Sequence, residues 1–202
     1  MKLIQFASTC NAYLLILDSK EALLFDCPVP QRSIISALDK EEATLKAILL
    51  THGHYDHIYH LGDPFFRNVP IYMGEEDISY LSDPYLNLSK DWDIPLSFPD
   101  ISPIHLCDGQ SLELGTTILP LATPFHTSGS FCFYLPHEGI LFSGDTLFRL
   151  SIGRTDLPGA KPRLMDSSLE KLKKLPEQTI VYPGHEKKTT IAFEKANNPF
   201  LQ

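Results

Sequence analysis

The stretch at 51–57, THGHYDH, places three of the chain's eight histidines and one aspartate within seven residues. It directly follows the apolar run LKAILL, which predicts a buried strand. Side chains alternate along an extended segment, so we expect His52, His54 and Asp56 on one side. His57 is expected to turn inward as the next helix begins. Because four buried polar side chains without a ligand would stay unpaired, the stretch predicts a site for zinc or a similar divalent ion.

Three further polar residues have the same placement, each just past an apolar strand. His126 follows LPLATPF, Asp145 follows ILFSG, and His185 follows IVYPG. Any one of them alone would be interpreted as an ordinary loop or turn residue. Together with the first motif, they supply enough donors to complete two metal sites.

The order of these motifs resembles that of the metallo-beta-lactamase-fold hydrolases over nearly the whole chain. The similarity rests on HxHxDH, a lone histidine, the aspartate of GDT and the histidine of PGHE. It implies an α/β fold, a four-layer αβ/βα sandwich with two divalent ions at one edge between the sheets. Zinc is the expected ion, with iron or manganese as alternatives. The implied ligands are His52, His54 and His126 for the first ion, Asp56, His57 and His185 for the second, and Asp145 as a bridge.

A longer segment, SGDTLFRLSIGRTDLPG at 143–159, is similar to the glyoxalase II (hydroxyacylglutathione hydrolase) branch, especially its short bacterial members. The ending NPFL at 198–201 is similar too. This resemblance implies hydrolysis of a thioester, with S-lactoylglutathione as the reference substrate. A metal-bound hydroxide would attack the carbonyl. Asp56 would orient that nucleophile and take its proton.

The chain departs from the larger glyoxalase II proteins at the substrate side. The larger proteins carry a C-terminal helical domain with basic residues that bind the glutathione carboxylate. This chain is expected to be a single domain, 1–202, without that helical domain. Arg154 matches a basic position that contacts glutathione in relatives, and the alternative is a turn arginine paired with Asp156. Lys187 is a weaker candidate for the same role. Asp26 is expected to support backbone or ligand histidines, or to be a strand-terminal turn residue.

Two other functions fit the same motifs. Persulfide dioxygenases, which are mononuclear iron enzymes, share HxHxDH and a GRTD stretch, and would use only His52, His126 and Asp145. The other alternative is a non-catalytic metal-binding role. Loss of one of the metal-ligating residues would favour that role. The complete donor set and the sequence SIGRTDLPG favour the hydrolase.

Composition limits the partners and the location. The chain has 202 residues, 43% of them hydrophobic, and a net charge of −8 with scattered basic residues, so nucleic acid is not an expected partner. No apolar run approaches the roughly 20 residues of a membrane span. The four cysteines form no CxxC pair, and no leader is visible, so we expect a cytoplasmic protein with reduced thiols. A small-molecule thioester is the expected partner, and the oligomeric state stays open.

The hydrophobic pattern predicts sheets packed face to face with helices outside. The segment 62–103 carries many prolines and predicts short helices and loops. Helices are expected at 28–40, from a capping box formed by Ser167 and Glu170, and from about Glu186 to the NNP sequence. Strands are expected at 2–8, 12–18, 21–26, 45–50, 111–115, 116–123, 130–136, 139–145 and 178–184.

Overall fold

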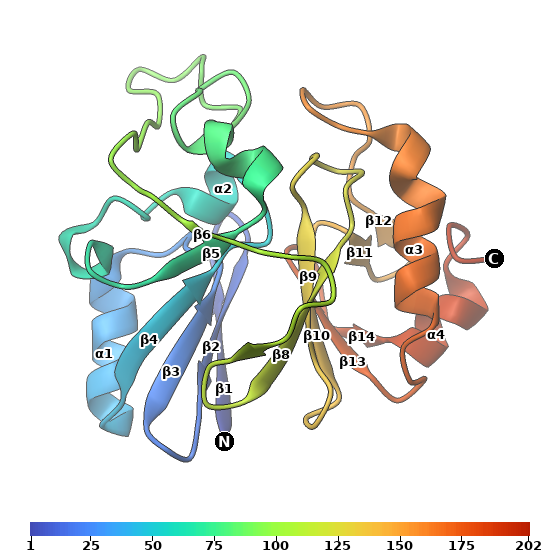
Figure 1. The fold of residues 1–202 in the computed structure, drawn as a ribbon, viewed down its shortest axis with the longest axis horizontal. Helices are drawn as coiled ribbons and strands as arrows, with labels where there is room; N and C mark the ends of the chain where they lie inside the picture. The colour runs from blue at the N-terminus through green and yellow to red at the C-terminus, as the bar shows by residue number, and fades with distance from the viewer.

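Two six-stranded mixed sheets pack face to face in the computed structural model, which describes all 202 residues (Figure 1). The first sheet follows chain order, with antiparallel pairs β1–β2 and β2–β3 and parallel pairs from β3 onward. Its strands are Lys2–Ala7 (β1), Asn11–Ile16 (β2), Glu21–Phe25 (β3), Thr44–Leu49 (β4), Ile71–Met73 (β5) and Ile104–His105 (β6).

The second sheet has the order β14-β13-β10-β9-β8-β7. Only the pair β10–β13 is parallel. Its strands are Leu112–Glu113 (β7), Thr117–Ala122 (β8), Phe131–Leu135 (β9), Ile140–Gly144 (β10), Ile180–Pro183 (β13) and Thr189–Thr190 (β14). A small hairpin of Leu147–Phe148 (β11) and Ser151–Ile152 (β12) follows β10.

Helices cover the two outer faces of this pair of sheets, which gives four layers and confirms the predicted αβ/βα sandwich (Figure 1). The helix α1 (Gln31–Glu41) lies on the first sheet, and α3 (Met165–Lys173) and α4 (Ile191–Asn197) lie on the second. Short helices fill the connections: α2 (Tyr55–Ile58), η1 (Pro64–Phe66), η2 (Glu75–Leu81) and η3 (Pro162–Leu164). None of these helices has the length and apolar character that spanning a membrane requires.

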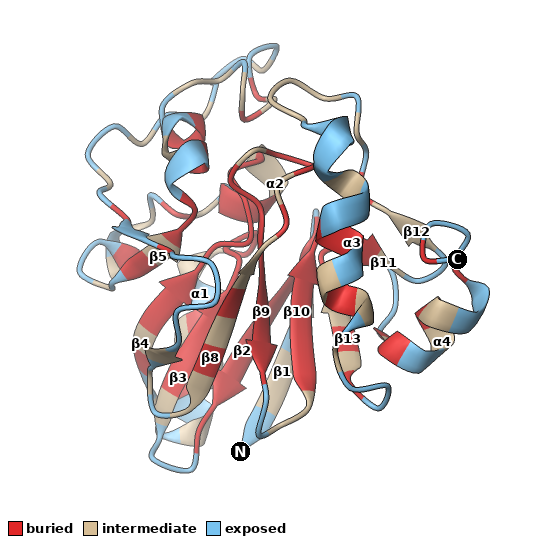
Figure 2. Cartoon of the chain, turned by 45° about the vertical axis from the view of Figure 1, so that its right-hand side comes forward, coloured by how far each residue is buried: buried red, intermediate tan, exposed pale blue.

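Three apolar layers explain why the central strands are buried on both faces (Figure 2). Along β2, Leu14 and Ile16 pack toward α1, while the alternate residues Tyr13 and Leu15 pack between the sheets. This alternation follows from the two-residue period of a strand. The rings of Phe25 and Phe142 stack between the sheets with their centroids 3.8 Å apart. A central strand therefore needs an uninterrupted apolar sequence such as LKAILL, because both of its faces pack against a hydrophobic core.

All three predicted helices begin at other residues than expected, α1 at Gln31 instead of residue 28. The capping box at Ser167 is wrong, because α3 already begins at Met165 and the Ser167 hydroxyl donates to the Leu164 carbonyl from inside the helix. The last helix begins at Ile191, five residues later than predicted. Residues 189–190 instead form β14, and Thr190 caps α4 by accepting a hydrogen bond from the Phe193 N–H. Pairing with β13, a long-range contact, overrides the local helical pattern there.

The topology brings several strand ends to one edge of the sandwich. The strands β3, β4 and β5 run parallel, so their carboxyl ends share an edge of the first sheet. In the second sheet, β8, β10 and β13 point the same way, because β8 and β10 are both antiparallel to β9. The Phe131 N–H donates to the Thr51 carbonyl at 2.8 Å, which joins the two sheets at this edge. Every predicted metal-ligating residue follows one of these strand ends.

Candidate metal centre

The first group of donors contains His52 and His54, which follow β4, and His126, which follows β8. Their ligand atoms all lie within 4.8 Å of one another, and all three side chains are buried. His54 Nδ1 is 3.1 Å from His52 Nε2 and 3.0 Å from His126 Nε2. Three imidazole nitrogens that converge in this way match the donor chemistry of a zinc site.

The second group contains Asp56, His57 and His185, whose ligand atoms also converge within 4.8 Å. Asp56 Oδ2 is 3.1 Å from His185 Nε2 and 3.8 Å from His57 Nε2. Asp56 reaches this group because α2 begins at Tyr55, with His54 as its N-cap. The expectation that Asp56 shares a strand face with the first two histidines was therefore wrong. The helical turn directs it to the second group instead.

Asp145, directly after β10, contacts both groups. Its Oδ2 lies 3.5 Å from His126 Nε2 and 3.5 Å from His185 Nε2. Its Oδ1 lies 3.3 Å from His57 Nε2. One carboxylate thus faces donors of both groups, the placement that a shared ligand of two ions requires.

Hydrogen bonds on the far side of the rings orient three of the histidines. His57 Nδ1 lies 2.8 Å from Asp26 Oδ2. His126 Nδ1 lies 2.8 Å from the Arg154 carbonyl. His52 Nδ1 lies 3.1 Å from the Thr51 hydroxyl, which in turn contacts the Asp26 carboxylate. Since a carbonyl or carboxylate can only accept, Nδ1 of His57 and His126 donates, which leaves Nε2 as the ring nitrogen directed toward a metal.

Asp26 also accepts a hydrogen bond from the Thr51 N–H at 2.8 Å, which fixes the start of the metal-binding loop. Its backbone has a φ of +60°, in the left-handed region that a residue other than glycine rarely adopts. The surrounding contacts hold the residue in this unfavourable conformation. Asp26 therefore lies where the sequence prediction of a supporting residue expected it, between the end of β3 and two histidines.

We expect Asp26→Asn to lower metal affinity by roughly 10- to 100-fold, because loss of a partner that orients a ligand histidine typically costs that much. The amide has the shape of the carboxylate but neither its charge nor its second acceptor. Competition with a colourimetric chelator would measure the affinity. Asp91→Asn is the matched control, since Asp91 is exposed. Equal affinities for the two variants would mean that Asp26 supports only the backbone.

The two candidate substrate contacts lie at the surface. Two hydrogen bonds of 2.9 and 3.0 Å join the Arg154 guanidinium to the Asp156 carboxylate, and the Arg154 side chain is 65% exposed. The turn pairing named as the alternative is therefore present. Lys187 is exposed and lies two residues past His185. The structure thus gives Arg154 one definite contact with the site, through its backbone carbonyl rather than its guanidinium.

Burial and neighbouring charges shift the pKa values of the histidines in the centre. Burial lowers the pKa of His52 far below its ordinary value, that of His54 to about 3, and that of His126 as well. These rings are neutral at pH 7 and can offer a lone pair. Burial also opposes charge on His57, but Cys10 and the carboxylates of Asp26, Asp145 and Asp56 outweigh it and raise the pKa of His57. The second group therefore carries excess negative charge, which a bound cation would neutralise.

Unpaired polar atoms support the fit of a metal. His57 Nε2 and Asp145 Oδ1 are buried without a hydrogen-bond partner, and they lie 3.3 Å apart inside the donor cluster. Buried polar atoms without partners are costly, so their concentration here indicates a missing ligand. The donor set of five imidazoles and two carboxylates fits divalent ions of the zinc, iron or manganese type.

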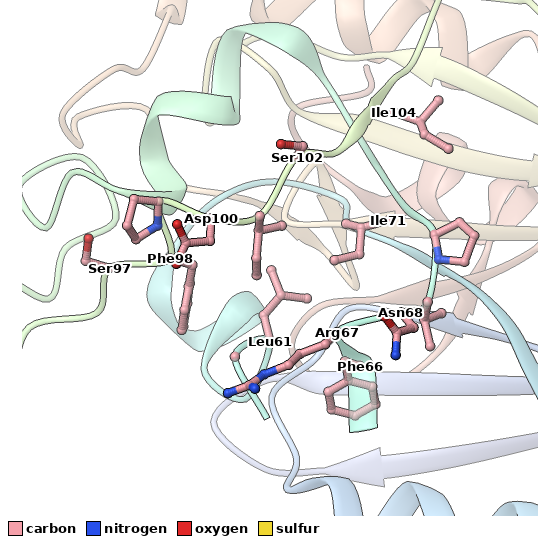
Figure 3. Close-up of a pocket in the computed structure, with 15 residues that line it drawn as sticks. Leu61, Phe66, Arg67, Asn68, Ile71, Ser97, Phe98, Asp100, Ser102 and Ile104 are labelled. Atoms are coloured by element: carbon pink, nitrogen blue, oxygen red, sulfur yellow. The ribbon is translucent and has the colours of Figure 1, made fainter. Parts of the chain in front are cut away.

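A cavity of about 780 Å³ lies elsewhere, between η1, β5 and the segment 97–104 (Figure 3). Leu61, Phe66 and Phe98 are among the fifteen residues that line it. None of the fifteen is a candidate metal ligand. This cavity is therefore separate from the donor cluster.

Thr51 and the Arg154 carbonyl were not identified from the sequence. Thr51 directly precedes the first histidine, and this adjacency was the signal that could have identified it. A backbone carbonyl carries no signature in the sequence, because every residue has one. The contact of the Arg154 carbonyl with His126 depends entirely on the path of the loop after β12.

A double-sheet sandwich with seven histidine and aspartate donors at one edge defines a class of metal-dependent hydrolases. The chain belongs to the metallo-beta-lactamase superfamily, whose sequence profile matches residues 6–185. It is 36% identical over 198 residues to the "Probable metallo-hydrolase YqgX" of Bacillus subtilis (strain 168), covering 95% of this chain and 92% of the relative. It is 37% identical to a hydroxyacylglutathione hydrolase of Bartonella quintana, but it spans only 65% of that protein's length.

Solved structures show the same fold over the whole chain. The BLEG-1 B3 metallo-beta-lactamase superposes with a TM-score of 0.90 at 40% identity, covering 99% of this chain and 98% of its own. The protein TTHA1623, solved in a di-iron-bound form, gives 0.86 at 32% identity with full coverage of both chains. ETHE1 from Myxococcus xanthus gives 0.79 at 25% identity, covering 98% of this chain and 84% of its own.

Proposed function

We propose that the protein is a hydrolase that uses two metal ions to cleave thioesters, with S-lactoylglutathione or a related acyl thioester as substrate. The observation that carries the proposal is the complete donor set: two converging groups of three, with Asp145 in contact with both. Zinc is the expected ion in both positions, with iron or manganese as alternatives. The similarity to a hydroxyacylglutathione hydrolase supports the choice of a thioester.

The residues of the centre have different roles in this proposal. Two bound ions would supply Lewis acidity and lower the pKa of a coordinated water. Asp56 and His185 are the donors most open to solvent, with side chains 15% and 34% exposed, so they mark the side from which substrate enters. Asp56 is placed there to orient the attacking water and accept its proton. The more deeply buried histidines hold the ions in place.

One experiment tests the proposal directly. Purified protein reconstituted with excess zinc should contain two ions per chain and release thiol from S-lactoylglutathione or from acyl thioesters of other thiols. Oxygen uptake on a persulfide is measured with the same protein after reconstitution with iron. A protein that binds a single iron and consumes oxygen, without cleaving thioesters, would overturn the proposal.

The similarity to ETHE1 favours a persulfide dioxygenase as the second candidate function. Such an enzyme would use His52, His126 and Asp145 around one iron. The convergence of Asp56, His57 and His185 into a second group argues for the hydrolase, because a mononuclear site would leave these donors without an ion. A non-catalytic role is less well supported, since none of the seven donors is lost.

Arg154→Ala should raise KM for S-lactoylglutathione by roughly 2- to 5-fold and change kcat less, because an exposed ion pair contributes little and binds substrate and transition state alike. The proposal assigns Arg154 to the glutathione carboxylates, for which its guanidinium must leave Asp156 or share it. Steady-state kinetics on this substrate measure the effect.

Two further variants sharpen the interpretation of Arg154. Asp156→Asn removes the competing carboxylate and should lower KM. Lys173→Ala is the control, because Lys173 also forms an ion pair with a carboxylate, that of Glu170 on α3, although its side chain is only 28% exposed. If Arg154→Ala and Lys173→Ala give the same KM as the parent protein, Arg154 does not contact the substrate, and Lys187 becomes the next residue to test.

A further inference from the structure

Asp77 lies in η2, and its carboxylate is fully buried although it belongs to neither donor group. Its Oδ2 accepts hydrogen bonds from the Gly53 N–H at 3.0 Å and from the Thr127 hydroxyl at 2.7 Å. Its Oδ1 accepts one from the Gly129 N–H at 2.7 Å. Burial raises the pKa of Asp77 to about 6 against these hydrogen bonds, so the carboxylate is mostly ionised at neutral pH and then can only accept.

The partners of Asp77 belong to the two loops that carry the first donor group. Gly53 lies between His52 and His54, and Thr127 directly follows His126. One oxygen atom therefore connects the loop after β4 to the loop after β8. The histidines of the first group come from segments 72 residues apart, and their nitrogens must still meet at 3.0 Å. Their relative position depends on such a connection.

The packing of η2 against these loops leaves little freedom. A Cβ atom on Gly53 would lie 2.4 Å from the Cβ of Tyr80, and one on Gly129 would lie 2.6 Å from the Asp77 nitrogen. The fully buried Tyr80 ring also packs against His54, with their centroids 5.8 Å apart. The short helix is therefore in direct contact with both loops, and a shift of Asp77 would be transmitted to them.

We infer that Asp77 is a positioning residue that sets the spacing between His52, His54 and His126, and through it the metal affinity of the first donor group. The three charge-assisted hydrogen bonds hold the loops in the arrangement that the ion requires before it binds, which lowers the cost of binding. The inference rests on the proposed function only in assuming that these histidines bind a metal. It does not depend on the reaction catalysed.

Asp77→Asn distinguishes this role from simple packing, because the side chain keeps its shape but exchanges one acceptor for a donor. In one orientation the amide nitrogen faces the Gly129 N–H. In the other it faces the Gly53 N–H and the Thr127 hydroxyl. A backbone N–H therefore loses its partner in either case. In the first orientation this is the Gly129 N–H, and the oxygen that connects the two loops loses its charge; in the second it is the Gly53 N–H, and the connection between the loops is broken.

The test uses the Asp56→Ala background, in which the first group is the one that keeps all its donors. Cobalt binding is followed by its visible absorption in competition with a chelator. Adding Asp77→Asn should weaken the affinity by roughly 10- to 100-fold, as loss of an orienting partner does at metal sites, and alter the cobalt spectrum. Adding Asp91→Asn should change neither. A purely structural Asp77 would lower the melting temperature of the metal-free protein but leave affinity and spectrum unchanged, which would overturn the inference.

Thr127→Val provides a second route if Asp77→Asn does not fold. It removes one of the hydrogen bonds to Asp77, together with the hydroxyl contact to Ser130 Oγ at 2.6 Å, and keeps the size and branching of the side chain. We expect a smaller but measurable loss of cobalt affinity in the same background, on the order of 3- to 10-fold, because only one of the three hydrogen bonds to the Asp77 carboxylate is lost. An unchanged affinity would overturn the inference. Since no thioester is used, a failed hydrolase assay would not affect either result.

Discussion

The Asp56→Ala variant should bind one metal ion per chain instead of two and lose hydrolysis by more than the roughly 10- to 100-fold that a supporting residue costs. Asp56 provides the carboxylate nearest to His185, at 3.1 Å, and the proposed contact with the attacking water. The fold should be retained, because Asp56 lies at the open side of the cluster and belongs to none of the three apolar layers. Metal analysis, steady-state kinetics and circular dichroism measure the three outcomes.

Asp91→Ala serves as the control for Asp56→Ala, since it also removes one carboxylate, at an exposed position. It should retain two ions and the turnover of the parent protein. If Asp56→Ala turns over thioesters at the rate of this control, Asp56 is not a ligand in the working enzyme. The nucleophile would then depend on the first group and Asp145 alone.

Removal of metal should abolish thioester hydrolysis and lower the melting temperature of the protein. Burial raises the pKa of Asp56 and of Asp145, but the neighbouring histidines outweigh it and lower both pKa values, so both carboxylates are ionised at neutral pH and a bound cation would stabilise the folded state. At a free metal concentration about 1,000 times the dissociation constant, binding contributes about 4 kcal/mol to the free energy of unfolding. For a domain of this size, that corresponds to a shift of roughly 8–16 °C.

Dialysis against a chelator, followed by a thermal melt and an activity assay, measures both effects. The control is the same chelator loaded with zinc beforehand, which should change neither. Two equivalents of zinc should restore activity and melting temperature together. A metal-free protein that melts at the temperature of the loaded one would show that the seven donors do not hold ions in the folded chain.

The hydrophobic pattern was sufficient to predict the layered fold. Runs such as LKAILL and the alternation along β2 specify strands with two buried faces, and each strand ends where polar donors begin. These signals are local, so they can be interpreted without knowledge of the rest of the chain. The starts of α3 and α4 were not predictable in the same way. Ser167 and Glu186 lie in locally helical patterns, but pairing of Thr189 and Thr190 with β13 decides where the last helix begins.

The sequence by itself determined which residues could bind a metal, because this capacity belongs to the imidazole and carboxylate groups and to their positions after apolar strands. The resemblance to a known family implied how these donors are grouped, but only the tertiary structure decided how they are positioned and supported. The helical turn at Tyr55 sends Asp56 to the second group, and the Arg154 carbonyl and the Asp77 carboxylate reach the loops of the first. These contacts join segments remote in sequence, and the packing of the two sheets sets their distances. A local pattern contains no information about such distances.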